Sequence, residues 1–258
     1  MEDCHTRYPI LLLHGLNCRD DCFSGCWGRI PEVLRERGAV VYLGHQDAWG
    51  TIEGNARGLL LLAEKILKTE RTQKLNLIAH SKGGLEARYL ISTLGFAGQT
   101  ASLTTLCTPH RGAKSAEVWQ KRKMVCIAAG RALEIGWRRF GDQSPDFRNA
   151  VASLTPEALE RFNQENPDSS QVYYQSWGAL LAKRTWDLMD RAQLWLTKSD
   201  GPTDALVTPE SAKWGEYRGT MENVSHQDFA GARRRKLAHF SAEEFFIRLV
   251  QELAEKGF

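Results

Sequence analysis

The sequence predicts an α/β fold in which a mostly parallel β-sheet carries helices on both faces. Three observations indicate this class. Short apolar runs of strand length alternate with helical segments through the first 110 or so residues, which is typical of parallel sheets. Clusters of polar residues follow directly after the predicted strands, where such sheets bind ligands. The length of 258 residues suits one large domain with a well-buried core.

The alternating elements are assigned from their apolar patterns. Strands are expected where buried-type residues run together, because a strand inside a parallel sheet is apolar on both faces. Helices are expected where apolar residues recur at helical spacing. The expected strands are residues 9–13, 39–43, 75–79 and 103–107, and the expected helices between them are residues 27–37, 55–68 and 83–94.

The alternation stops after residue 112. Residues 115–139 mix apolar side chains such as Ala132 and Ile135 with basic ones, which indicates one or two helices inserted after a strand. We interpret residues 113–150, approximately, as a helical lid or cap on a single domain that covers residues 1–258. Regular structure is expected to return with a helix at 157–162, a strand at 172–175 and a final helix at 242–255.

The composition excludes several classes of protein. The chain is 42% hydrophobic and 25% charged, with a net charge of +3, so it is expected to be globular and is too weakly basic to favour nucleic acid. We interpret the basic clusters at residues 121–123 and 233–236 as solvated helix faces. The apolar runs are far shorter than the roughly 20 residues of a membrane-spanning helix, so no transmembrane segment is expected.

The first residues also lack the pattern of a secretory signal, because a polar start leads into a short apolar run with no cleavage site. This predicts a cytoplasmic protein, or a secreted one if the sequence is that of a mature or trimmed chain.

Six cysteines in a chain of this length do not make a disulfide scaffold. Cys18, Cys22 and Cys26 recur every four residues, but the residues between them read as turns, and no histidine pair follows at zinc-finger spacing. We expect a plain loop there, with a metal site or a disulfide as the alternative. Cys107 falls in an apolar strand pattern, which predicts an inert buried thiol.

The segment LIAHSKGGL at residues 77–85 predicts the chemistry, because it is similar to a nucleophile elbow. In the G-x-S-x-G elbow, a serine occupies a tight turn between a strand and a helix. Ser81 has that context. Ala79 replaces the first glycine and adds one methyl group, which we expect the turn to tolerate, whereas Gly83 has no such freedom. Ser81 is therefore the predicted nucleophile.

A serine hydroxyl is a weak nucleophile and needs a histidine base that is oriented by a carboxylate. With a serine elbow, the order along the chain is serine, acid, histidine. His110 follows Ser81 too early to leave room for the acid, and His239 precedes the last helix, where packing or capping is expected. His226 follows a short possible strand, lies among loop-like residues and is the predicted base.

Four aspartates lie in the permitted interval, namely Asp187, Asp190, Asp200 and Asp204. Asp204 begins a loop that runs into an apolar segment, and it precedes His226 by a spacing that suits one intervening element. Asp200 resembles a turn residue and remains the alternative. Asp204 is the predicted acid.

An oxyanion hole needs two backbone N–H groups aimed at the developing negative charge. One is expected from Lys82, at the start of the helix that follows the nucleophile. The other is expected from Leu16, in the loop after the first strand, where Gly15 allows the backbone to turn.

Taken together, four stretches resemble the bacterial true lipases of the α/β-hydrolase fold, the group of the Pseudomonas and Burkholderia lipases and their clostridial-type relatives. The stretches are residues 8–16, the serine elbow, residues 108–112 and residues 204–207 leading to 226–228. The resemblance implies a triad of Ser81, Asp204 and His226, an oxyanion hole at Leu16 and Lys82, and a helical lid.

The activity implied by this resemblance is that of a serine carboxylester hydrolase acting on acylglycerols or other fatty-acyl esters, with contact to a lipid–water interface. An intracellular esterase, an acyltransferase or a polyester depolymerase with the same triad is the alternative. A non-catalytic relative that binds a small ligand or a partner protein is the competing class, and it would be expected to lose a triad member.

The resemblance also implies a structural calcium that braces the histidine loop, although it implies no cofactor for the chemistry. Asp228, two residues after His226, matches one ligand, and Asp190 matches the other, with Asp187 as its alternative. Carboxylate oxygens of this kind suit calcium. Surface aspartates without an ion are the opposing interpretation. Two departures from the family pattern affect loop geometry, since Ala79 and Ala205 stand where these lipases usually have glycine.

Overall fold

The part of the protein that the structure describes is built on a six-stranded sheet. The computed structural model describes residues 4–258 except 21–24, 122, 182–186 and 234–236. The strand order is β2-β1-β3-β4-β5-β6, and every neighbouring pair is parallel. The strands are β1 (Ile10–Leu13), β2 (Val41–Leu43), β3 (Leu75–His80), β4 (Thr100–Leu106), β5 (Tyr173–Leu180) and β6 (Glu216–Glu222). The predicted parallel sheet is confirmed.

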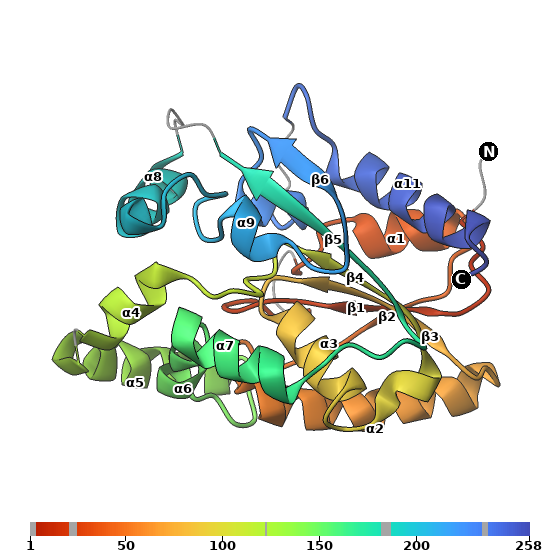
Figure 1. The fold of residues 1–258 in the computed structure, drawn as a ribbon, viewed down its shortest axis with the longest axis horizontal. Coiled ribbons are helices and arrows are strands. Elements are labelled where there is room, and N and C mark those ends of the chain that lie inside the picture. Colours follow the sequence, from red (N-terminus) through yellow and green to blue (C-terminus); the bar gives the residue numbers. More distant parts are fainter. Residues whose placement is uncertain (1–3, 21–24, 122, 182–186, 234–236) are drawn as a thin grey trace.

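Helices cover both faces of this sheet (Figure 1). One face is covered by α1 (Ile30–Glu36) and α11 (Ala242–Glu255), and the other by α2 (Ile52–Glu70) and α3 (Gly83–Ile91). Successive strand residues point to opposite faces. Thus Ile10 and Leu12 join the core cluster of α1 and α11, whereas Leu11 and Leu13 join that of α2 and α3. This alternation explains why the strand sequence is continuously apolar.

Some element boundaries differ from those predicted. Helix α2 begins at Ile52 and not at residue 55, because the Thr51 side chain caps it by accepting a hydrogen bond from the Gly54 N–H at 3.0 Å. Strand β5 continues to Leu180, well beyond the predicted end at residue 175. Its later residues pair with β6, so this extension depends on a neighbour that the local pattern does not reveal.

Helix α8 (Leu188–Leu196) is absent from the sequence prediction, and strand β6 was expected only as a short possible strand before His226, without bounds. β6 has the sequence EYRGTME and occupies an edge of the sheet, where its side chains are exposed or half-buried. Edge strands of this kind carry polar residues, which discourage pairing with other chains. No apolar run therefore marks it.

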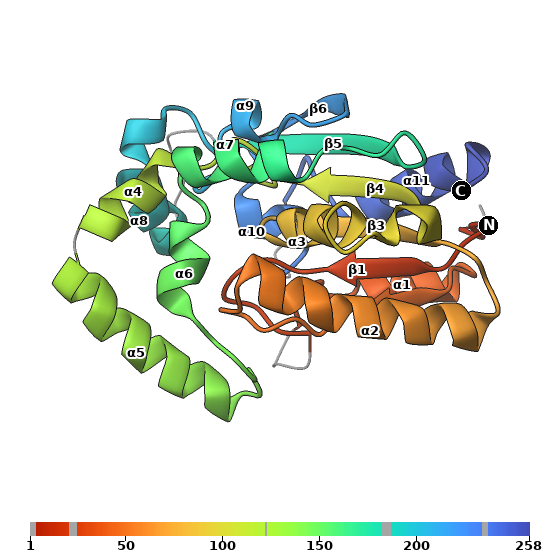
Figure 2. The ribbon, with the colours of Figure 1, turned by 60° about the horizontal axis from the view of Figure 1, so that its bottom comes forward.

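A helical insertion separates β4 from β5. It contains α4 (Lys114–Lys121), α5 (Lys123–Arg139), α6 (Phe147–Ala152) and α7 (Pro156–Glu165). Figure 2 shows α4, α5 and α6 beyond the carboxyl ends of the strands, near α8. The insertion thus lies at the edge where ligands bind in parallel sheets.

The cysteine prediction needs a correction, because Cys18 and Cys26 form a disulfide. We expected a plain loop, since local spacing cannot show how a loop closes on itself; Cys22 lies outside the described residues. Cys107 is buried, as predicted. Among the described helices, none combines the length and the apolar character needed to cross a membrane.

Candidate active site

Ser81 occupies a sharp turn between β3 and α3. Its φ angle of +55° is one that few residues other than glycine adopt. The Ser81 N–H donates to the carbonyl of Leu106 at 2.9 Å, and the hydroxyl of Thr108 donates to the Ser81 carbonyl at 2.7 Å. These long-range bonds hold a strained backbone in place, as strained sites require. The side chain remains partly exposed at the carboxyl edge of the sheet.

Two glycines allow this turn to approach the neighbouring loop. A Cβ atom added to Gly83 would lie 2.5 Å from the carbonyl oxygens of both Leu13 and His14. A Cβ atom added to Gly15 would lie 2.5 Å from the Cβ of Ser81. Cβ atoms essentially never lie this close to other atoms, so both positions need glycine. Ala79, in contrast, is an ordinary β3 residue within the core, which explains why an alanine fits there.

Asp204 and His226 form a buried pair. The His226 Nδ1–H donates to Asp204 Oδ2 at 2.7 Å, and the His226 backbone N–H donates to the Asp204 carbonyl at 2.8 Å. The other carboxylate oxygen, Oδ1, accepts from the backbone N–H groups of Leu206 at 2.9 Å and Val207 at 2.7 Å. The carboxylate is therefore fixed, and it fixes the tautomer of the histidine with Nε2 unprotonated.

His80 ties the histidine loop to the serine turn, a role that sequence reasoning missed. Its Nε2–H donates to the His226 carbonyl at 2.9 Å, and the centres of the two rings are 4.5 Å apart. Burial, reinforced by the neighbouring His226, holds the pKa of His80 well below its ordinary value. A neutral His80 keeps one N–H for this bond. Because His80 directly precedes Ser81, it brings the loop of His226 to the serine turn.

Cys107 was expected to be inert, and its surroundings agree with that. Burial raises the pKa of its thiol well above the ordinary value, and the negative charge of Asp204 and a hydrogen bond to it raise it further. The sulfur therefore stays protonated beside the carboxylate. Asp204 thus lies among hydrogen-bond donors and not beside a second nucleophile.

The loop after β1 reaches the site from the other side. Gly15 approaches Ser81 so closely that a Cβ atom would not fit between them. Leu16 is the next residue of this loop. The Leu16 side chain packs against the cluster that includes Trp49 and Phe147, and the next residue, Asn17, donates its N–H to the Ala48 carbonyl at 3.1 Å. Lys82 follows Ser81 directly in the chain, and the loop of Leu16 approaches Ser81 through Gly15; their roles as oxyanion donors stay a prediction.

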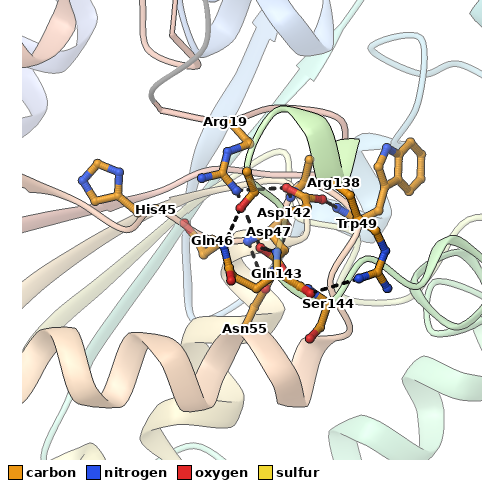
Figure 3. Close-up of polar contacts among 12 residues, drawn as sticks. Arg19, His45, Gln46, Asp47, Trp49, Asn55, Arg138, Asp142, Gln143 and Ser144 are labelled. Carbon is orange, nitrogen blue, oxygen red and sulfur yellow. Dashed lines mark hydrogen bonds and ion pairs between the residues drawn. The ribbon is translucent and has the colours of Figure 1, made fainter. Parts of the chain in front are cut away.

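Polar contacts join the same region to the insertion (Figure 3). Asp142, which follows α5, accepts from the N–H groups of Ala48 at 2.9 Å and Trp49 at 3.1 Å, and from Arg19 at 3.0 Å. In return, Asp47 accepts from two backbone N–H groups at residues 143 and 144, at 2.8 and 2.6 Å. Hydrogen bonds thus hold the segment after α5 against the loop after β2.

The rejected alternatives for the triad have other partners. His110 is buried away from the pair, where its Nε2 lies 3.0 Å from Thr105 Oγ1 and its ring stacks on Trp214. His239 contacts the Asn223 carbonyl at 3.1 Å. Asp200 accepts from the Ser115 N–H at 3.2 Å, at the start of α4. None of these contacts involves Ser81 or His226.

The two aspartates of the predicted calcium site have protein partners. Arg233 Nη1 lies 2.7 Å from Asp190 Oδ1 and 3.1 Å from Asp187 Oδ2. Asp228 accepts from the Ser225 hydroxyl at 2.6 Å. A guanidinium therefore lies beside Asp190 and its alternative Asp187, but the printed contact of Asp228 is with a hydroxyl. These contacts show the carboxylates paired with protein groups and give no support to calcium. The calcium site stays a prediction.

The interpretation of residues 233–236 as a solvated face is wrong for Arg233, whose side chain is only 14% exposed; residues 234–236 lie outside the described part, as do the side chains of the cluster at 121–123. Its Nε also donates to Gln227 Oε1 at 2.8 Å, beside His226. Arg233 thus links the start of α8 to the histidine loop.

Arg233→Gln is expected to lower the free energy of unfolding by about 3 kcal/mol, because it removes a close positive charge from the buried carboxylate of Asp190. A calcium chelator is expected to leave the native protein unchanged. Urea unfolding measures both effects. The control is Arg248→Gln, whose exposed pair with Glu244 is worth less than about 1 kcal/mol. A chelator that destabilises the native protein, together with an unchanged stability of Arg233→Gln, would favour calcium at this site.

Ala205→Gly is expected to stabilise the protein by about 1 kcal/mol. Ala205 follows the predicted acid with a φ angle of +90°, where an alanine is strained and a glycine is not. Ala79→Gly is the control, because it has ordinary strand geometry and should lose stability. Urea unfolding of both variants checks the prediction, and a less stable Ala205→Gly would contradict the strain.

Solved structures share this fold. The mature form of a lipase from Bacillus licheniformis superposes with a TM-score of 0.71 at 16% identity, over 95% of this chain and 94% of that one. A metagenomic carboxyl esterase superposes with a TM-score of 0.72 at 17% identity, over 96% and 76%. With the serine turn and the Asp–His pair at the carboxyl edge of a parallel sheet, these likenesses place the protein in the α/β-hydrolase class.

Sequence relatives identify the family. The chain is 30% identical over 253 residues to triacylglycerol lipase 2 of Saccharomyces cerevisiae, covering 90% of this chain and 74% of that protein. It is also 30% identical over 254 residues to a triacylglycerol lipase of Vibrio cholerae, covering 86% and 79%. No protein-family model matches the chain. The chain belongs to the triacylglycerol lipase family of the α/β-hydrolase fold, and it is a lipase-type ester hydrolase.

Proposed function

We propose that this chain hydrolyses acyl esters through a covalent acyl-enzyme on Ser81. His226 Nε2 takes the proton of the Ser81 hydroxyl as its oxygen attacks the ester carbonyl carbon. The resulting oxyanion accepts hydrogen bonds from the backbone N–H groups of Leu16 and Lys82. The bond to the leaving oxygen then breaks, and His226 gives its proton to the departing alcohol.

The second half of the reaction uses the same groups. His226 takes a proton from a water molecule, whose oxygen attacks the acyl carbon. The bond to Ser81 Oγ breaks, the proton returns to the serine, and a carboxylic acid leaves. Asp204 orients the histidine and stabilises its positive charge in both halves. The observation that carries this proposal is the buried Asp204–His226 hydrogen bond of 2.7 Å, held at the Ser81 turn by His80.

The substrates that we propose are acylglycerols or other fatty-acyl esters. The names of the relatives, triacylglycerol lipase and carboxyl esterase, support an acyl ester. Contact with a lipid–water interface is supported by large exposed apolar side chains in and just after α5, namely Ile135 at 60% and Phe140 at 52% exposure. The position of α4 and α5 beyond the strand ends supports a lid in this part of the insertion.

The proposed substrate class is tested with p-nitrophenyl esters of increasing acyl length. A lipase-type site is expected to give its highest kcat/KM on long chains. A maximum on short chains would favour the esterase alternative. An inactive native protein would overturn the proposal. Labelling with a fluorophosphonate, located by mass spectrometry, should find the phosphonate on Ser81, and a label elsewhere would contradict the assigned nucleophile.

A further inference from the structure

A buried ion pair lies directly behind the serine turn. Lys82 directly precedes α3 and Glu86 lies in its first turn; each is only 1% exposed, and the Lys82 ammonium pairs with Glu86 Oε1. Taking two charges out of water is costly, and an apolar pair of similar size is often as stable. The pair therefore calls for a role beyond filling space.

Glu86 has two further donors, which come from different parts of the fold. The Gln46 side-chain amide donates to Glu86 Oε2 at 2.6 Å, and the Asn55 side-chain amide donates to Oε1 at 2.8 Å. Gln46 belongs to the loop after β2 and Asn55 to α2; both are labelled in Figure 3. The carboxylate thus joins three segments of the chain, and its oxygens are well supplied with donors.

Gln46 also hydrogen-bonds to the loop that contains Leu16. Its Oε1 accepts from the His14 backbone N–H at 3.3 Å, and its Nε2 donates to the His14 carbonyl at 3.3 Å. The His14 ring returns a contact, with Nε2 at 3.1 Å from the Gln46 carbonyl. The Gln46 side-chain amide therefore fixes both the N–H and the carbonyl of His14. Leu16, the proposed oxyanion donor, lies two residues further along the chain.

We infer that Glu86 is a positioning residue that sets the geometry of the oxyanion hole through Gln46. Glu86 lies on the helix that directly follows Lys82, which is one of the two donors. Its carboxylate holds the side-chain amide of Gln46, which aligns the loop of Leu16, the other donor. The two donors are thereby held relative to each other by one buried carboxylate. This inference rests on the proposed function, which gives Leu16 and Lys82 their roles.

Two variants test the connection. Glu86→Gln keeps the shape but removes the charge, so its amide cannot accept from all three donors. Gln46→Leu removes the link to His14. Both are expected to lower kcat by about 10- to 100-fold, a part of what a lost oxyanion donor costs, with KM changed less than about threefold. Thr93→Val, which removes a hydrogen bond to Asn166 just after α3, is the control and should keep kcat.

Binding of an alkyl boronic acid separates positioning from general stability. Its tetrahedral adduct with Ser81 places an anionic oxygen in the hole, so its inhibition constant should rise in parallel with the loss of kcat. The double variant should lose no more than the worse single variant, because both act through one connection. If Glu86→Gln does not fold, Gln46→Leu carries the test alone.

The outcomes distinguish this inference from the proposed function. Unchanged kcat and unchanged boronate inhibition in a folded Gln46→Leu would overturn the positioning role while Ser81 remained the nucleophile. Fully additive losses in the double variant would also overturn it. Activity that survives Ser81→Ala would overturn the proposed function itself, and the inference with it.

Discussion

Ser81→Ala is expected to abolish ester hydrolysis, with kcat lower by about 10⁴- to 10⁶-fold. The hydroxyl is the proposed nucleophile, and the Cys107 thiol is not expected to replace it, because it is buried and has a raised pKa. The turn should survive, since alanine keeps the Cβ atom and both backbone hydrogen bonds of Ser81. Steady-state hydrolysis of a p-nitrophenyl ester measures the loss.

The matched control for this variant is Ser169→Ala. Ser169 precedes β5, at the amino end of the strands, and its side chain makes a local contact with the Gln171 N–H at 3.3 Å. It should keep full activity. Both variants should unfold close to the native midpoint. Residual activity of Ser81→Ala above about 1% of native would show that the reaction does not pass through this serine.

Asp204→Asn is expected to lower kcat by about 10⁴-fold near neutral pH, as loss of the triad acid does elsewhere. Two backbone N–H groups donate to Asp204 Oδ1, so that position should keep the amide oxygen. The amide nitrogen then faces His226 Nδ1, and two donors cannot bond. His226 must present Nδ1 as an acceptor and carry its proton on Nε2, where it can no longer take the proton of Ser81.

Asp200→Asn provides the control, because Asp200 is the alternative acid in the sequence. Its carboxylate accepts from the Ser115 N–H at 3.2 Å, so the variant should change kcat less than about threefold. Kinetics at several pH values, with unfolding midpoints for both proteins, complete the test. A large loss in Asp200→Asn together with a mild one in Asp204→Asn would reverse the assignment.

The fold class was predictable because its signal is local. A strand of a parallel sheet is apolar on both faces, and the strand sequences before and after the first helices show this without knowledge of their neighbours. The serine turn was predictable for the same reason, since strand, Ser81 and Gly83 lie within a few residues of one another. The bounds of strand β6 were not predictable, and only a short possible strand before His226 was expected, because its edge position removes the apolar pattern that marks the other strands.

Local patterns in the chain were enough to predict the parallel sheet, the serine turn and a short set of candidates for its partners. The folded structure was needed to show that Asp204 and not Asp200 meets His226, that Arg233 accompanies Asp190, and that Glu86 reaches the loop of Leu16 through Gln46. The two differ because hydrophobic periodicity and turn strain act between near neighbours in the chain. Buried charges and hydrogen bonds instead find their partners across the fold, where any of several similar side chains could have been the one brought within reach.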